Sequence, residues 1–186
     1  MAEAYPTFLA GQRLTASLLR SSQEQVARKT SDTSRAAVTT TSPDPHLQFE
    51  VAANAVYRWQ GWVKYDGPTA ADLSLDFSAP VGSLGEWAAI GIGHSPVIGA
   101  SPAPALQTDT QDARGYLTRF ETNDVTSARS YGTLGTGNTP VTTWLYGMLR
   151  TSTTAGTFSL DWAQLASNAT AVTLYTDSWL SMLRIA

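Results

Sequence analysis

The chain has 186 residues, of which 42% are hydrophobic and only 15% are charged, and its formal net charge is −3. This length suits one domain with a core of its own, and the lack of any block rich in Lys and Arg argues against nucleic-acid binding. The chain has no cysteine, which excludes disulfides, thiolate metal sites and cysteine nucleophiles.

The N-terminal region is predicted to attach the chain to a larger assembly. Residues 1–13 are expected to form an extended arm, and Thr15 can cap a helix that continues to Arg28. We therefore divide the chain into an anchoring arm and helix, residues 1–30, and a β-domain, residues 31–186. No signal peptide or membrane-length apolar run is present, so we expect synthesis in a cytoplasm and no membrane partner. The predicted anchoring residues are the apolar ones of the arm and helix: Phe8, Leu9, Leu14, Leu18, Leu19 and Val26.

From about residue 29 the apolar residues recur with a period of two, which is typical of strands with one buried face. Short strands at regular spacing favour a mainly β fold, an antiparallel β-sandwich of jelly-roll type. The last three strands are expected to form a meander. The predicted strands are 47–51, 57–65, 73–78, 87–92, 115–121, 128–134, 142–150, 158–162, 172–174 and 179–185.

The segment 142–150 is apolar on both of its faces. Trp144, Tyr146 and Met148 alternate with Leu145 and Leu149. A strand of this kind is covered on both sides, by another sheet or by another subunit. Together with the low content of charged residues, it predicts association of the chain with copies of itself.

The tryptophans suggest an alternative function. Trp59, Trp162 and Trp179 are in phase with aliphatic residues of their strands and are predicted to lie in the core, whereas Trp62 and Trp87 are predicted to be exposed. The segment from His94 to Asp112 is predicted to be a long loop. An exposed tryptophan beside such a loop could bind a surface glycan, so the alternative is a receptor-binding or glycan-binding module.

Residues that could support catalysis or bind a metal are few. The two histidines, His46 and His94, lie in loops flanked by proline, and Asp44 beside His46 lacks further ligands for a metal site. Asp72 and Asp76 share the outer side of one strand, but alternating polar residues are usual on any half-exposed strand. No Gly-x-Ser-x-Gly motif is present. We expect no cofactor, no metal and no enzymatic activity, which leaves an esterase or glycosidase as the least favoured function.

Three segments resemble structural proteins encoded by bacteriophages of actinobacteria, especially of streptomycetes. The C-terminal segment runs from TAGTFSLDWAQ at residues 154–164 to SWLSMLRI at residues 178–185. The central segment is HLQFEVAANAVY at residues 46–57, and the first is FLAGQRLTA at residues 8–16. Their order along the chain carries the resemblance more than any one of them does.

The resemblance implies a virion component of the head-fibre, minor capsid or minor tail class, with a jelly-roll body and three copies in the assembly. The expected partners are the chain itself and capsid or tail proteins, and the head is slightly favoured over the tail. The segment from His94 to Asp112 has no counterpart in these proteins from which a role could be assigned.

Overall fold

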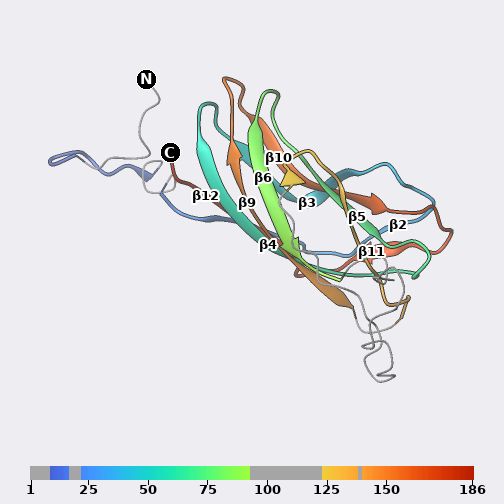
Figure 1. The fold of residues 1–186 in the computed structure, drawn as a ribbon. Coiled ribbons are helices and arrows are strands. Elements are labelled where there is room, and N and C mark those ends of the chain that lie inside the picture. The colour runs from blue at the N-terminus through green and yellow to red at the C-terminus, as the bar shows by residue number, and fades with distance from the viewer. Residues whose placement is uncertain (1–8, 17–21, 93–122, 138–139) are drawn as a thin grey trace, which may run out of the picture.

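The computed structural model describes residues 9–16, 22–92, 123–137 and 140–186, and these residues form two layers of antiparallel strands (Figure 1). The predicted strand 115–121 and the predicted loop from His94 to Asp112 lie outside the described residues. The strands are β1 (Gln25–Arg28), β2 (Thr33–Arg35), β3 (Ser42–Val51), β4 (Val56–Asp66), β5 (Leu73–Ser78), β6 (Leu84–Ile90), β7 (Asn123–Asp124), β8 (Arg129–Tyr131), β9 (Val141–Arg150), β10 (Gly156–Gln164), β11 (Val172–Leu174) and β12 (Trp179–Arg184).

The strands divide into a larger and a smaller sheet. The eight-stranded sheet has the order β1-β12-β4-β9-β6-β7, with β11 pairing with both β2 and β4, and the four-stranded sheet has the order β3-β10-β5-β8. The prediction of a mainly β, antiparallel sandwich is therefore confirmed. The predicted meander is wrong, because β10 belongs to the smaller sheet whereas β11 and β12 both pair with β4 of the larger sheet.

The helix predicted between Thr15 and Arg28 does not form at its C-terminal end. Gln25–Arg28 is strand β1, which pairs antiparallel with β12. Residues 17–21 lie outside the described residues, so the rest of that prediction is not tested. Residues 25–28 form a strand because β12 offers unpaired backbone groups along its edge. Pairing with this edge stabilises the segment more than a helix with a thin apolar stripe would.

The core lies between the sheets and is centred on four aromatic rings. Phe77 of β5 stacks on Phe158 of β10, with ring centroids 5.3 Å apart and nearly parallel planes. From the larger sheet, Trp59 lies 4.6 Å from Phe77 and Trp87 lies 5.1 Å from it on another side. All four side chains are buried. The aromatic cluster thus joins the two layers through direct ring contacts.

A buried ion pair fixes the start of the β-domain. Lys29 Nζ lies 2.7 Å from Asp44 Oδ2, and both side chains are 0% exposed. Lys29 also donates to Thr33 Oγ1, and Trp162 Nε1 donates to the same Asp44 oxygen at 3.1 Å. The second Asp44 oxygen accepts the backbone N–H of His46. Buried charges are tolerated when they are paired and hydrogen-bonded in this way.

The outward side of the smaller sheet is polar and partly covered by the segment 38–41. The backbone oxygen of Val38 accepts a hydrogen bond from Gln164. Asp76 lies opposite Asp161 on the neighbouring strand. The pKa of Asp76 is raised, first by its burial and then by the charge of Asp161, against the opposing effect of hydrogen bonds from Phe77 and Thr41.

We expect the Asp76→Asn variant to unfold at a higher temperature than the wild type at pH 7. Because the folded-state pKa of Asp76 lies above the unfolded one, the ionised carboxylate disfavours the folded state at neutral pH. This cost is relieved as the pH falls through the folded-state pKa, so the difference between the two proteins should vanish below about pH 3.5. Thermal unfolding across this pH range measures the effect. A variant that is less stable than the wild type at pH 7 would contradict it.

Candidate assembly face on the larger sheet

The candidate functional site is the side of the eight-stranded sheet that is turned away from the smaller sheet, which we call the outer face. Alternation along β9 places Leu145 and Leu149 in the core and leaves Trp144 and Tyr146 on the outer face, 48% and 45% exposed. The prediction that this strand is apolar on both sides is confirmed. One side is covered by the sandwich, and in the single chain the other is open to solvent. The remaining apolar residues of the outer face are Leu84, Ile90, Met148, Trp62, Trp179 and Leu183.

Three tryptophans from three neighbouring strands form a row across the outer face. Trp179 of β12 is the register partner of Trp62 of β4, and Trp62 is the partner of Trp144 of β9. Ile90 of β6 continues the row beyond Trp144. The rings of Trp144 and Trp179 meet edge to face, with centroids 6.0 Å apart. We call these four residues the tryptophan row.

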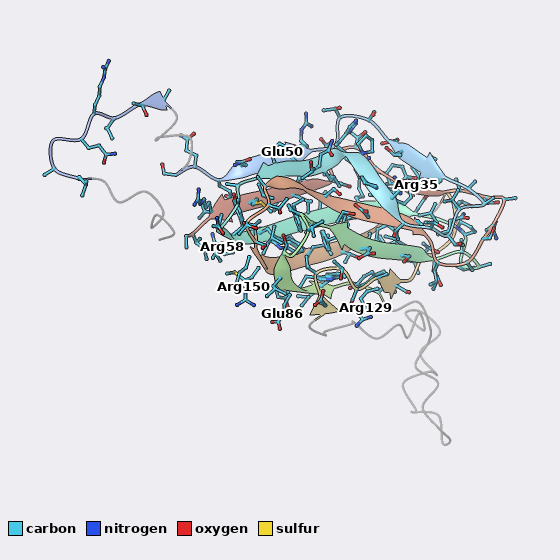
Figure 2. All side chains as sticks on the ribbon, turned by 90° about the horizontal axis from the view of Figure 1, so that it is seen from above. Arg35, Glu50, Arg58, Glu86, Arg129 and Arg150 are labelled. Atoms are coloured by element: carbon cyan, nitrogen blue, oxygen red, sulfur yellow. The ribbon has the colours of Figure 1, made fainter. Side chains whose placement is uncertain are left out.

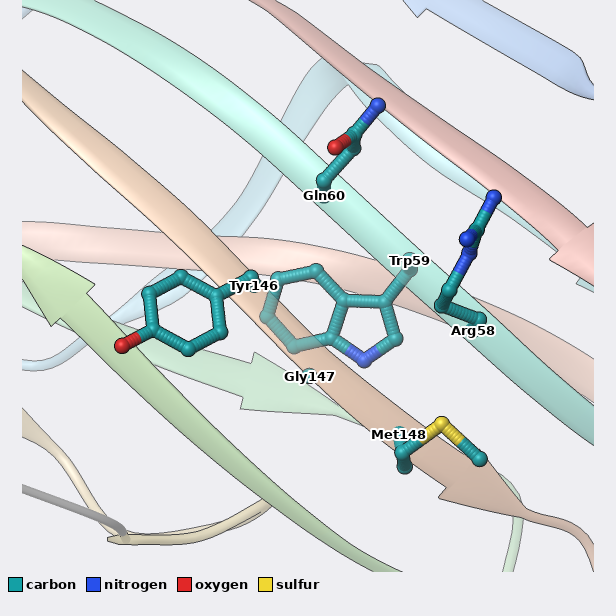
Figure 3. A pocket seen from close by; sticks show the side chains of 6 residues that line it. All are labelled: Arg58, Trp59, Gln60, Tyr146, Gly147 and Met148. Carbon is teal, nitrogen blue, oxygen red and sulfur yellow. The ribbon is translucent and has the colours of Figure 1, made fainter.

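A shallow hollow of about 310 Å³ lies beside the row, between β4 and β9. Figure 3 shows Arg58 and Gln60 on the β4 side and Tyr146 and Met148 on the β9 side. Its remaining lining residues, Trp59 and Gly147, are register partners.

Gly147 cannot be replaced by a residue with a side chain without a local shift. A Cβ atom there would lie 2.6 Å from the indole ring of Trp59 and 2.5 Å from the backbone oxygen of Glu86. Glycine thus lets the Trp59 ring pack directly beneath β9.

Two charged residues of opposite sign lie at one level of the outer face. Arg58 of β4 and Glu86 of β6 are both register partners of Met148, one from each side. Figure 2 labels Arg58, Arg150 and Glu86 along one side of the molecule and Glu50 on the other. Within the part of the chain that the structure describes, the ion pairs are Arg28 with Asp177 and Lys29 with Asp44, so neither Arg58 nor Glu86 takes part in one.

The outward side of the smaller sheet is different in chemistry. Its exposed side chains include Gln48, Glu50, Thr157 and Ser78, and Thr157 donates a hydrogen bond to Glu50. The large apolar side chains of this sheet, such as Leu47, Phe49 and Phe158, point inward and are buried in the core. The exposed aromatic surface is thus concentrated on one of the two sheets. Contiguous exposed apolar surface of this kind marks a contact site.

Trp62 and Trp87, the two tryptophans predicted to contact a ligand, differ in their exposure. Trp62 lies in the middle of the tryptophan row and is half-buried. The expectation that Trp87 is exposed is wrong: it is 1% exposed, and its Nε1 donates to the backbone oxygen of Asp124. Trp59 and Trp162 are in the core as predicted, whereas Trp179 lies on the outer face. Alternation alone could not assign Trp179, because Leu180 and Met182, in the opposite phase, supply the buried side of β12.

The other predicted site residues are placed as follows. Leu9, Leu14 and Val26 are exposed, and Val26 lies on the edge strand β1. Phe8, Leu18, Leu19 and His94 lie outside the described residues, so anchoring by these side chains stays a prediction.

His46, Asp72 and Asp76 all accept backbone hydrogen bonds, and Asp76 accepts the one from Phe77. His46 Nδ1 accepts the backbone N–H of Thr30, and Asp72 Oδ1 accepts the backbone N–H of Thr133. Among the residues that the structure describes, no three His, Asp or Glu side chains are grouped so as to hold a metal ion. The described residues also contain no helix long and apolar enough to cross a membrane.

Comparison with known proteins assigns no family. No family model matches the chain, and no curated protein matches it. Among solved structures, the chain is similar to the VP2 subviral particle of infectious bursal disease virus, with 7% identity and a TM-score of 0.22 over 88% of this chain and 41% of that one. It is also similar to the structure of the Gt strain of the same virus, with 8% identity and a TM-score of 0.18 over 87% and 42%. The chain spans less than half the length of these proteins, and scores this low assign neither fold nor function.

Proposed function

We propose that this chain is a structural protein of a bacteriophage virion, a surface decoration or fibre component that acts without catalysis. Copies of the chain associate through the outer face, and the N-terminal arm joins them to the capsid or tail. The observation that carries the self-association is the tryptophan row with its exposed neighbours Tyr146 and Met148. The assignment to a phage particle rests on the resemblance of residues 8–16, 46–57 and 154–185 to phage structural proteins, which also implies three copies.

The strand pairing supports a body of jelly-roll type. Strands β3 to β10 pair in a nested order, β3 with β10, β4 with β9, β5 with β8 and β6 with β7. This is the pattern of one long antiparallel ribbon rolled into two facing sheets. Jelly rolls of eight strands are common in viral capsid domains and also in lectins, so the fold suits the proposed role without deciding it.

The proposed function is tested by following the chain into virus particles. A tagged full chain and a tagged variant that lacks residues 1–22 are produced in host cells during infection by the phage that encodes the chain. The deletion stops before β1, because Gln25–Arg28 belongs to the larger sheet. We expect purified virions to contain the full chain and not the variant, while both proteins self-associate in the lysate.

Two results would contradict the proposal. Virions without the full chain, at a time when the chain is abundant in the cell, would remove the virion assignment. Virions that contain the shortened chain in equal amount would remove the anchoring role of the arm and leave the rest standing.

A glycan-binding module of the tail is the second candidate, and the hollow beside Tyr146 is the observation that favours it. Aromatic rings with nearby hydrogen-bonding groups suit sugars, and Arg58 and Gln60 supply such groups at the hollow. A glycan array with the wild type and the Gln60→Ala variant separates the two functions, because Gln60 lines the hollow and is not part of the tryptophan row. Binding to host-wall glycans that the variant loses while it stays folded would favour the second candidate.

A further inference from the structure

We propose that two copies of the chain pack outer face against outer face around a two-fold axis that runs along β9. The inference rests on the self-association proposed above and adds the partner and its orientation. A contact between identical faces is self-complementary, so each residue on one side meets a fixed residue of the second copy. The larger sheet allows this assignment to be derived strand by strand.

The axis is placed along β9 because this strand carries the most exposed aromatic residues and lies between β4 and β6. Both neighbours pair with β9 in continuous register. A rotation by 180° about an axis parallel to β9 leaves the position of each residue along the strand unchanged. It exchanges the side of the sheet that holds β4 with the side that holds β6. It therefore sets β4 of one copy opposite β6 of the second copy, with β9 facing β9. Face-to-face sheets with nearly aligned strands are a common packing arrangement in proteins.

This arrangement pairs two charged residues of opposite sign that flank the centre of β9 and take part in neither of the ion pairs of the described part of the chain. Arg58 and Glu86 lie at the same level, because Met148 is the register partner of both. In the pair, Arg58 of one copy faces Glu86 of the second copy, and the symmetry makes this contact twice. Complementary charges of this kind fix the orientation of an interface.

The other levels bring apolar groups together. Trp62 and Ile90 are both at the level of Trp144, so Trp62 of one copy faces Ile90 of the second copy. At the end of β9 the axis sets Arg150 of one copy opposite Arg150 of the second copy, and there the long side chains can carry both charges into water. An in-plane axis perpendicular to β9 would instead set β4 against β4, and Arg58 would lose its acidic partner. The charges thus select one of the two orientations.

Packing of two chains outer face against outer face predicts that the assembly in solution has an even number of copies. If the chain forms no other contact, the particle has two copies. If three copies also associate through other surfaces, as the resemblance implies, the outer faces join two such trimers into six. Native mass spectrometry distinguishes these even numbers from one or three.

The orientation is tested by charge reversal measured with sedimentation equilibrium. Each of the variants Arg58→Glu and Glu86→Arg places like charges at both symmetry-related contacts, and we expect the dissociation constant to rise about tenfold. The double variant restores opposite charges and should return to within about threefold of the wild type. Glu50→Arg is the matched control on the smaller sheet, where no change is expected.

The outcomes separate this inference from the proposed function. A wild type that associates with an odd number of copies, or single variants with unchanged dissociation constants, overturns the face-to-face pair and leaves self-association standing. A double variant as weak as the singles overturns the contact between Arg58 and Glu86. A wild type that stays monomeric overturns both the pair and the self-association in the proposed function.

Discussion

The Asp44→Asn variant should lose about 3–5 kcal/mol of its free energy of unfolding, because it leaves the Lys29 ammonium group charged, buried and without a counter-charge. Both side chains of the pair are 0% exposed, and Nζ and Oδ2 lie 2.7 Å apart. Asp44 also accepts hydrogen bonds from Trp162 and from the backbone of His46, so one carboxylate joins β3 to β10 and to the segment before β2.

Urea denaturation at pH 7, followed by tryptophan fluorescence, measures this effect. For a chain of this size the same loss should lower the midpoint of thermal unfolding by about 6–20 °C. Asp177→Asn is the matched control, because Asp177 pairs with Arg28 at the surface with more than half of each side chain exposed. An exposed pair contributes about 1 kcal/mol or less. Equal losses in the two variants would show that the buried pair does not stabilise the fold as argued.

The second large effect is expected at the centre of the outer face. Replacing Trp144 and Tyr146 together by serine should weaken self-association at least about 100-fold, because aromatic residues at the centre of an interface often contribute more than 2 kcal/mol each. The monomer should stay folded and lose about 2–4 kcal/mol of its free energy of unfolding, since about half of each ring is already exposed in the single chain and Trp144 loses its edge-to-face contact with Trp179. The variant therefore separates association from folding.

Sedimentation velocity and urea denaturation of the same samples provide the two readouts. Val81→Ser is the control, because Val81 is an apolar residue, 83% exposed, in the turn between β5 and β6 and away from the tryptophan row. We expect the control to associate like the wild type. Unchanged association of the double serine variant would exclude the outer face as the interface. A variant that unfolds would mean that the two rings are part of the core, against their exposure.

Much of the fold could be predicted from the alternation of apolar residues. The two sides of β4 were assigned correctly, because the alternate positions from Tyr57 to Tyr65 are all buried. For β9 the alternation predicted that both sides are apolar, and the structure shows that Leu145 and Leu149 form the buried side. The sheet to which each strand belongs could not be predicted, because alternation shows which side is buried and not which neighbour pairs with it. The last three strands illustrate this, since a turn between β10 and β11 carries the chain from one sheet to the other.

The site was predictable only in part for the same reason. Trp144 and Tyr146 stood out because their strand is apolar on both sides. The tryptophan row depends on the register between β12, β4 and β9, whose residues are far apart in sequence. Trp87 was misassigned because its strand has aliphatic residues on both sides, and only the partner strands show which side faces the core. The Lys29 to Asp44 pair is likewise formed by loop and strand ends that no periodic pattern relates.

The central claim is that the outer face of the eight-stranded sheet is an interface, and the most direct measurement is sedimentation velocity of the purified wild-type chain from about 1 to 100 μM. Interfaces of this kind commonly reach micromolar dissociation constants or tighter. The account predicts a species larger than one chain, and the fraction of the protein in this species should rise with concentration. A single monomeric species over the whole range would contradict it.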